Sequence, residues 1–227
     1  MNWMNGNEKD VLRYTAIGDS LSVGVGASLF SPGFVERYLH LAENKLQKQI
    51  DVMKFAETGA TTEDVLKSLD LPFVEEEIKN SEMITITAGG NDLIDVAEKF
   101  LETKDEQVLL QALTNCRKNM SSILKKIHQL KSQSADLYFI RLVNLYNPFP
   151  DRKEAVKWVR AFNKHLESFS RLKGVSVAKI DQAFQGNEER FLSFDGVHPN
   201  DFGYDKIAEV LNELGYAPLD LENMPEE

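Results

Sequence analysis

The chain has little cysteine, a deficit of positive charge and no long apolar run. Cys116 is the single cysteine among 227 residues, which excludes an internal disulfide and a zinc site built from several thiolates. Lysine and arginine number 26 against 36 aspartates and glutamates, which gives a formal net charge of -10. Nucleic acids and anionic membrane surfaces attract clustered positive charge, so we expect neither as a partner. No segment approaches the length of a membrane span, so no integral membrane segment is expected.

The length and a hydrophobic content of 42% indicate one globular domain over residues 1–227, with its core at about 12–215 and loosely ordered tails. The first ten residues contain no apolar core of signal-peptide length. We therefore expect a cytoplasmic protein, with export without a leader as the open alternative. Cys116 lies at helical spacing from Leu109 and Leu113 and is interpreted as a small apolar helix residue, with a nucleophilic role as the alternative.

Short apolar, β-rich runs alternate with longer amphipathic ones. The predicted strands are 13–18, 52–56, 83–88, 137–143 and 175–180. Most are continuously apolar, which is typical of strands covered on both faces. The predicted helices are 34–46, 108–127, 156–169 and 204–214; the second allows a break near Asn115. This alternation predicts a parallel sheet with helices on both faces and right-handed crossovers.

In such a sheet the functional groups gather beyond the carboxyl ends of the strands. The first predicted strand ends in Gly18-Asp19-Ser20, where glycine permits a sharp turn. The serine then enters the first turn of a helix, whose free N–H groups favour an anion. After the second strand comes Gly59, whose N–H can point into a site without side-chain obstruction, and a helix start capped by Thr61 or Thr62. After the third come paired glycines and the amide donor Asn91.

The last two predicted strands also end in residues suited to a site. The fourth opens into a proline-bearing loop with Tyr146 and Phe149, which could wall an apolar pocket. Beyond the fifth lie Asp195 and His198, and their spacing of three residues lets the aspartate fold back onto an imidazole nitrogen. Pro199 stiffens this loop and disfavours helical geometry at His198.

Together these residues predict a nucleophilic catalytic system. Ser20 supplies the attacking oxygen, and His198 removes and returns its proton because an imidazole titrates near neutrality. Asp195 fixes the imidazole tautomer and stabilises its cationic form. The backbone N–H groups of Ser20 and Gly59, with the side-chain amide of Asn91, are predicted to hold the tetrahedral oxyanion.

Four sequence blocks carry a resemblance to a known family: Gly18-Asp19-Ser20-Leu21, Gly59, Gly89-x-Asn91-Asp92 and Asp195-x-x-His198. In this order they resemble the SGNH hydrolase superfamily, the GDSL lipase/esterase group, over about Tyr14 to Ala208. The resemblance implies a flavodoxin-like, three-layer α/β/α fold with about five parallel strands. It also implies acyl hydrolysis without a metal or any other cofactor.

Several residues of these blocks are expected to support the site. Gly18 and Gly89 belong to its backbone, and Asp19 and Asp92 are interpreted as structural carboxylates that bond loop N–H groups, with direct catalysis as the alternative. The aspartates at the strand ends could also gather a metal. Such a site usually has more than one histidine or a denser carboxylate set, so no metal is expected.

The remaining candidates are interpreted without a catalytic role. His40, His128 and His165 lie in helical, charge-rich stretches and are expected on helix faces or at the surface. Gly24 and Gly26 could cradle a phosphate, but no lysine follows them in a P-loop arrangement. Close packing of the first helix, or flexibility near the nucleophile, is expected instead.

The predicted activity is that of a serine acyl hydrolase, which cleaves carboxylic esters through an acyl-enzyme intermediate. The expected partner is a small-molecule acyl ester or a lipid such as a lysophospholipid; acyl thioesters and acetylated sugars are the alternatives. A predicted acyl pocket slightly favours a lipid-like or aryl group and comprises Leu21, Leu93, Ile94, Tyr146, Phe149 and Val197. An acyltransferase with the same triad and a non-catalytic flavodoxin-like binding module are the other possibilities, and the oligomeric state is left open.

Overall fold

The computed structural model describes residues 11–132, 134 and 137–220 and is built around one parallel sheet. The strands lie in the order β2-β1-β3-β4-β5 and all pair in parallel. Their bounds are β1 (Val11–Gly18), β2 (Gln49–Ala56), β3 (Met83–Ile86), β4 (Phe139–Val143) and β5 (Val175–Ala178). The predicted α/β class and the five parallel strands are confirmed.

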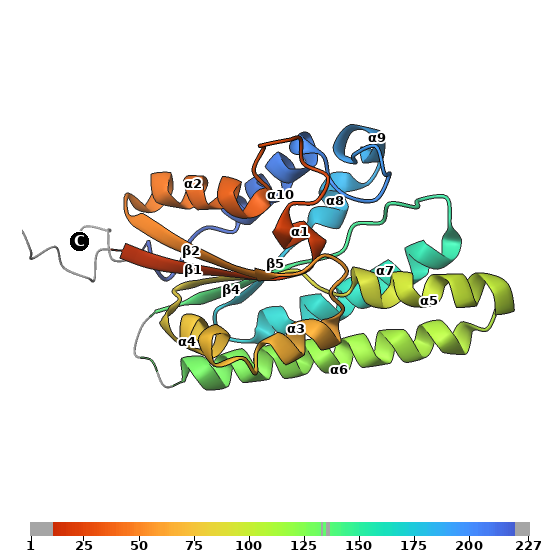
Figure 1. Cartoon of the computed structure of the whole chain (residues 1–227), viewed down its shortest axis with the longest axis horizontal. Helices are drawn as coiled ribbons and strands as arrows, with labels where there is room; N and C mark the ends of the chain where they lie inside the picture. Colours follow the sequence, from red (N-terminus) through yellow and green to blue (C-terminus); the bar gives the residue numbers. More distant parts are fainter. Residues whose placement is uncertain (1–10, 133, 135–136, 221–227) are drawn as a thin grey trace, which may run out of the picture.

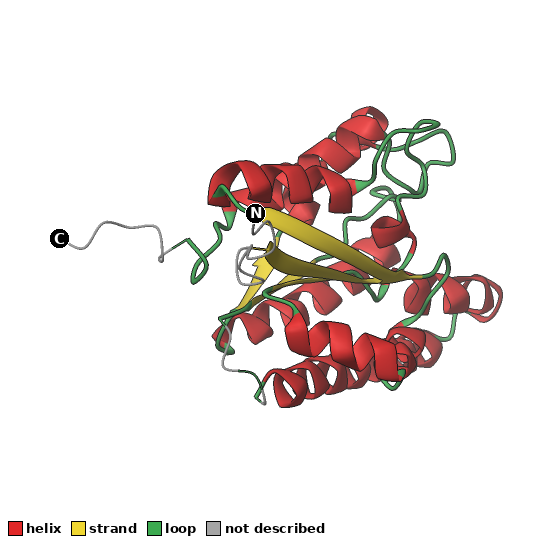
Figure 2. Cartoon of the chain, turned by 60° about the vertical axis from the view of Figure 1, so that its left-hand side comes forward, coloured by secondary structure: helices red, strands yellow, loops and turns green. Residues whose placement is uncertain are grey.

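Helices cover both faces of the sheet, which gives the predicted three layers (Figure 1). One face carries α2 (Phe34–Leu46), α8 (Ile180–Phe184), α9 (Glu188–Phe191) and α10 (Asp201–Glu213). The other carries α3 (Thr62–Ser68), α4 (Pro72–Asn80), α5 (Gly90–Thr103), α6 (Glu106–Lys131) and α7 (Lys153–Ser168), followed by the short η2 (Phe169–Arg171). Figure 2 shows the sheet between these two helical layers. No helix within the described ranges is long and apolar enough to cross a membrane.

The sheet separates two apolar cores because successive side chains of a strand point to opposite faces. On β1, Tyr14 and Ala16 belong to the core under α2 and α10, whereas Ile17 belongs to the core on the α6 side. All residues of β3 and β4 are buried. Burial on both faces explains why these strands are almost wholly apolar in the sequence. The two polar members are satisfied within the fold: Thr85 bonds the Tyr14 hydroxyl, and Arg141 donates to the Gly215 carbonyl.

Several element boundaries differ from the sequence predictions. α6 continues without a break through Asn115, whose side chain accepts a hydrogen bond from Gln111 one turn earlier, at 2.9 Å. β2 begins at Gln49 rather than at residue 52, because it pairs with β1 from Val11 onward. β4 begins at Phe139 rather than at residue 137. The predicted loose tails fall on residues 1–10 and 221–227, which lie outside the described residues.

The strand order positions the site. From β1 the chain crosses to β2 on one side, and β3 pairs with β1 on the other, so a crevice forms at the carboxyl ends of these strands. There the Thr87 N–H donates to the Ile17 carbonyl, and the Asp19 N–H donates to Thr87 Oγ1, both at 3.1 Å. Gly18 has a φ of +153°, and a side chain in its place would overlap Thr87. The glycine therefore allows the β1 end to lie directly against the β3 end.

Candidate active site

Ser20 is the first residue of α1 (Ser20–Val23), a single helical turn that follows β1 directly. Asp19 caps this turn, because its Oδ1 accepts a hydrogen bond from the Leu21 N–H at 3.1 Å. Burial raises the pKa of Asp19, and hydrogen bonds from Leu21 and Thr87 oppose that rise. The Ser20 N–H, at the first helical position, has no acceptor inside the helix. The turn thus holds the hydroxyl and a free N–H at the carboxyl edge of the sheet.

Three side chains form a hydrogen-bonded relay. Ser20 Oγ lies 3.0 Å from His198 Nε2, and His198 Nδ1 lies 2.7 Å from Asp195 Oδ2. These are the spacings expected of a nucleophile, a base and the group that orients the base. The structure therefore brings together the three side chains that the sequence predicted as a triad.

Asp195 is fixed by its own loop. Its Oδ1 accepts hydrogen bonds from the Val197 N–H at 2.8 Å, from the His198 N–H at 2.9 Å and from Ser193 Oγ at 2.9 Å. Burial acts to raise the pKa of Asp195, but the hydrogen bonds from His198, Val197 and Ser193 outweigh it and lower the pKa. The carboxylate therefore stays ionised and oriented toward the imidazole.

Gly26 packs against this loop, a contact that the sequence did not indicate. Its φ is +95°, and a Cβ there would lie 2.5 Å from the Pro199 carbonyl oxygen and 2.9 Å from His198 Cβ. Only glycine lets the chain after α1 approach the histidine so closely. The signal in the sequence was the repeated glycine at Gly24 and Gly26, and the structure shows close packing at both, with Gly24 against Gly33 and Gly26 against His198 and Pro199.

The predicted oxyanion donors lie on the two neighbouring strand ends. The β2–α3 loop is tied to β1 by the Glu57 N–H, which donates to the Gly18 carbonyl at 3.1 Å. Within the described part of the chain, the Gly59 N–H has no acceptor. Asn91 Nδ2 donates to the Ala60 carbonyl at 2.9 Å, which leaves its second hydrogen free for a ligand.

Asp92 joins the starts of α3 and α5. Its carboxylate accepts from the Thr62 N–H at 2.8 Å and from Thr62 Oγ1 at 2.6 Å. The three aspartates at the site therefore have separate partners: Asp19 bonds Leu21, Asp92 bonds Thr62, and Asp195 bonds His198. The bonds of Asp19 and Asp92 to backbone N–H groups agree with a structural role for these two carboxylates. Across the residues that the structure describes, no three His, Cys, Asp or Glu side chains gather as metal ligands.

An apolar cavity of about 600 Å³ opens beside the relay and reaches Asn91, Asp195 and His198. Five of the predicted pocket residues line it: Leu93, Ile94, Tyr146, Phe149 and Val197. Much of the remaining wall comes from residues that the sequence did not indicate: Ala97, Phe100, Leu101, Leu109, Leu145, Ala155, Trp158 and Val159. These lie mainly on α5 and α7, and their shared signal was the helical spacing of apolar residues.

Leu21 is a correction to the predicted pocket. It does not line the cavity but is buried, at 7% exposure, in the core under α2 and α10. The α1 turn directs the side chain after the nucleophile into that core. Cys116 is also buried, on α6, and burial raises the pKa of its thiol, so it stays protonated.

The other histidines lie on helices apart from the relay. His40 is exposed on α2 beside Glu43, His128 on α6 contacts the Tyr138 hydroxyl at 2.9 Å, and His165 lies on α7. Burial lowers the pKa of both His128 and His165.

Comparison with known proteins agrees with this geometry. Residues 16–206 match the model of the GDSL-like Lipase/Acylhydrolase family. The spore germination lipase LipC of Bacillus licheniformis is 43% identical over 209 residues, which cover 92% of this chain and 99% of that protein. The crystal structure of the lipase Lip_vut3 from a goat rumen metagenome is 43% identical, with a TM-score of 0.88 over 92% of this chain and 99% of that one.

More distant structures share the fold. The family 3 carbohydrate esterase of Clostridium thermocellum is 16% identical, with a TM-score of 0.64 over 89% of this chain and 94% of that one. From the family match and the 43% identity to LipC, the chain belongs to the GDSL-like lipase/acylhydrolase family and is a GDSL-type carboxylic ester hydrolase.

Proposed function

We propose that this enzyme hydrolyses esters of apolar acyl chains, lipids and lysophospholipids among them, through an acyl-enzyme formed on Ser20. The observation that carries the proposal is the position of the relay. Ser20 Oγ is hydrogen-bonded to His198, and His198 also lines an apolar cavity of about 600 Å³. A cavity of this size and character accepts an acyl chain and excludes the water around it.

The first half of the proposed reaction transfers the acyl group. Ser20 Oγ attacks the ester carbonyl carbon while its proton moves to His198 Nε2. The carbonyl oxygen becomes an oxyanion, which accepts hydrogen bonds from the Ser20 and Gly59 N–H groups and from the Asn91 amide. When the carbon–oxygen bond breaks, His198 gives the proton to the departing alcohol. Asp195 remains ionised and stabilises the imidazolium.

The second half repeats these steps with water. His198 Nε2 takes a proton from a water molecule, whose oxygen attacks the acyl carbon on Ser20. The same donors hold the second oxyanion. Its collapse breaks the bond to Ser20 Oγ, which takes the proton back from His198, and the carboxylic acid leaves.

Replacement of the nucleophile tests the proposal directly. Ser20→Ala is expected to abolish turnover of p-nitrophenyl esters and labelling by a fluorophosphonate probe. Ser22→Ala, on the same helical turn, is the control and keeps both, because the Ser22 hydroxyl bonds Thr87 Oγ1 rather than His198. Undiminished labelling of the Ser20→Ala protein would refute the assignment of the nucleophile.

The substrate class is tested by filling the cavity. Ala155 lines the cavity on α7, so Ala155→Phe is expected to reduce turnover of the octanoyl ester far more than that of the acetyl ester. Val156→Phe, one residue further and outside the lining, is the matched control. If both variants keep the wild-type ratio of octanoyl-ester turnover to acetyl-ester turnover, the cavity does not hold the acyl chain. A wild-type preference for acyl thioesters or acetylated sugars would point to the alternative substrates.

A further inference from the structure

Two loops beside the relay carry large apolar side chains that the fold does not bury. Leu29 and Phe30, between α1 and α2, are 84% and 96% exposed. Phe194, directly before Asp195, is fully exposed, and Phe202 at the start of α10 is 63% exposed. We call these four residues the apolar rim. Exposed aromatic side chains are an interaction surface when several of them gather.

Contacts between the two segments hold the neighbours of the rim residues side by side. The Ser28 N–H donates to Asp201 Oδ1 at 3.0 Å, which joins the neighbour of Leu29 to the neighbour of Phe202. Gly26 lies against Ser193, the neighbour of Phe194, since a Cβ on Gly26 would come within 3.2 Å of Ser193 Oγ. In Figure 1 the red connection after α1 rises beside the blue start of α10. The rim therefore lies on the loops that hold Ser20 and His198.

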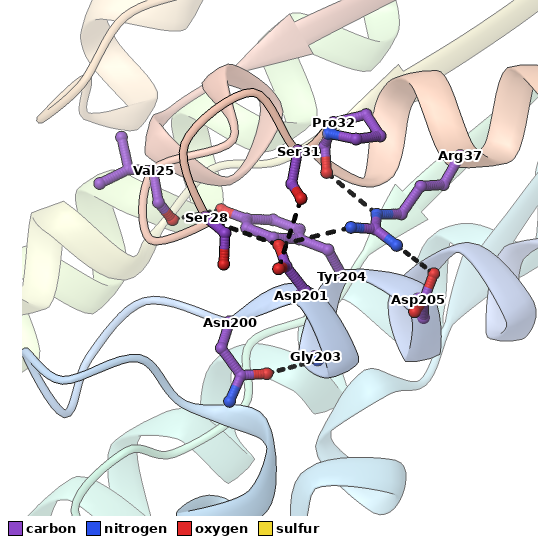
Figure 3. Close-up of polar contacts among 10 residues, drawn as sticks. All are labelled: Val25, Ser28, Ser31, Pro32, Arg37, Asn200, Asp201, Gly203, Tyr204 and Asp205. Carbon is purple, nitrogen blue, oxygen red and sulfur yellow. Dashed lines mark hydrogen bonds and ion pairs between the residues drawn. The ribbon is translucent and has the colours of Figure 1, made fainter.

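The base of the first loop is fastened on both sides of its tip (Figure 3). Before the tip, the Tyr204 hydroxyl donates to the Val25 carbonyl at 2.5 Å. After the tip, Ser31 Oγ donates to Asp201 Oδ2 at 3.4 Å, and Arg37 pairs with Asp201 at 3.5 Å. These bonds anchor the loop on α10, so Leu29 and Phe30 project from a fixed base.

Phe30 also has an unfavourable backbone. Its φ is +66°, in the left-handed region that a bulky side chain rarely adopts. Such a conformation costs free energy, and at 96% exposure the side chain has almost no contacts to offset it. A strained residue whose side chain makes almost no contact within the fold is a candidate for contact with a partner.

The charges around the rim identify the kind of partner. Residues 24–33 contain no charged side chain, and residues 192–200 contain only Asp195 and His198, which bond each other. The nearby Arg37 is paired with Asp201 and Asp205. With a net charge of -10 and no lysine or arginine within the two described segments 24–33 and 192–200, we expect the complementary surface to be apolar and without net negative charge.

We propose that the apolar rim inserts into the surface of a zwitterionic lipid aggregate and holds the mouth of the relay against it. The proposal rests on the proposed function, because it assumes that the ester is a lipid. Insertion removes four apolar side chains from water, and Leu29 and Phe30 have no charged neighbour within residues 24–33. An ester in the surface then has a short path to Ser20 and to the cavity beside it.

The test compares binding to phosphatidylcholine vesicles in three proteins. The rim variant is Leu29→Ser with Phe30→Asn, since asparagine accepts a left-handed backbone. The matched control is Leu71→Ser with Phe73→Ser, two exposed apolar residues at the start of α4, on the opposite face of the sheet from α10. The control is expected to sediment with vesicles as the wild type does, whereas the partition coefficient of the rim variant falls on the order of a hundredfold.

Turnover separates this proposal from the proposed function. On a water-soluble acetyl ester the rim variant is expected to stay within about twofold of wild type, since surface substitutions leave the relay intact. On an ester embedded in the vesicles its rate falls with the lost binding. Vesicle binding is also measured on Ser20→Ala. Binding without any esterase activity in the wild type would refute the proposed function alone, and activity without a difference in binding would refute the rim alone.

Three further outcomes would overturn the rim proposal. An equal loss of binding in the control variant would show that the effect is not specific to the rim. Binding only to vesicles that contain phosphatidylserine would contradict the charge argument. A wild-type dimer that ignores vesicles and becomes monomeric in the rim variant, measured by sedimentation velocity, would show that the rim contacts a second copy of the chain.

Discussion

Asp195 illustrates how individual residues prepare the relay. Its carboxylate accepts one hydrogen bond from the imidazole ring and others from Ser193 and two backbone N–H groups. These bonds keep the carboxylate ionised and fix its direction before substrate arrives. Preorganisation of this kind removes reorganisation from the reaction itself.

Asp195→Asn is therefore expected to lower kcat by about 10³–10⁴ with little change in KM, because an amide favours the wrong imidazole tautomer. Ser193→Ala removes one of several bonds to the same oxygen, so its loss is expected to stay near tenfold or below. Steady-state rates on a p-nitrophenyl ester measure both. Equal losses in the two variants would contradict the orienting role of Asp195.

Gly26→Ala tests the contact between the chain after α1 and the histidine. The new methyl would press on His198 and Pro199, so kcat is expected to fall about a hundredfold, as for a displacement near an ångström. Gly186→Ala is the control, since it has a φ of +75° but open space around its Cβ. Gly186→Ala is expected to lower the unfolding free energy by about 1 kcal/mol, measured in urea. Gly26→Ala is expected to lower it further, because its Cβ would overlap the Pro199 carbonyl oxygen. A matching loss of kcat in Gly186→Ala would remove the contact as the cause.

The sequence predicted the relay but not all that surrounds it. Ser20 follows the end of β1 directly, where the rule of strand ends places functional groups. Asp195 and His198 come after α8 and α9, and their spacing of three residues and the family blocks indicated them instead. Leu21 was assigned to the pocket from proximity in the chain, but the direction of a side chain in a single helical turn depends on the surrounding packing. The Gly26 contact joins distant segments, so the glycine itself is visible in the sequence but its partners, His198 and Pro199, are not.

Among the elements, α3 and α5 determine the oxyanion side of the site. α3 begins with a capping box, in which Thr61 and Asp64 each bond the other's backbone N–H. The hydrogen bonds lower the pKa of Asp64. Asp92 then ties α5 to the first residue of α3. Gly59 is held between these elements and the end of β2.

Thr61→Ala removes one partner of the capping box and is expected to lower the unfolding free energy by about 1 kcal/mol. Thr61→Ser keeps the hydroxyl and is expected to lower the unfolding free energy by only a few tenths of about 1 kcal/mol. Urea unfolding followed by circular dichroism measures the difference. If the serine variant lost as much as the alanine variant, the cap would not be the source of stability.

At this scale the sequence predicted the strands and the helix start at Thr61, but not the acyl cavity. The cavity walls belong to α5 and α7, and their apolar residues show only that one helix face is covered. Whether a covered face packs against another helix or borders an open volume depends on the angle between helices. For the same reason α5 itself, Gly90–Thr103, is absent from the helices predicted from the sequence.

For the molecule as a whole, buried and exposed carboxylates respond to pH in opposite ways. Hydrogen bonds lower the pKa of Asp64 and Asp201, and in Asp195 they outweigh burial. Their contribution to stability is present above the unfolded pKa near 3.8 and is lost as the pH falls toward the lowered folded values. Asp19 has a raised pKa, so its carboxyl lowers the stability of the fold as the pH rises from 3.8 to the raised folded pKa, and the loss is complete above that pKa.

Asp19→Asn is therefore expected to raise the unfolding free energy at pH 7 by about 1–2 kcal/mol, since the amide can still cap Leu21 without a buried charge. The gain shrinks as the pH falls through the raised folded pKa and vanishes below 3.8, the ordinary pKa of an aspartate, where the carboxyl is neutral in both states. Denaturation curves at several pH values test this. Asp51→Asn, at an exposed position, is the control, and a pH-independent gain at Asp19 would contradict the explanation.

The relay joins residues 178 positions apart, and this separation has a consequence for biosynthesis. Ser20 and the first strand leave the ribosome early, whereas the segment that carries the base follows the fifth strand. A nascent chain that has completed the sheet still exposes a serine without a base, and such a hydroxyl is a poor nucleophile. Only when α10 docks on the loop after α1 does His198 reach Ser20. The order of translation therefore leaves the unfinished chain without its base, and so without esterase activity.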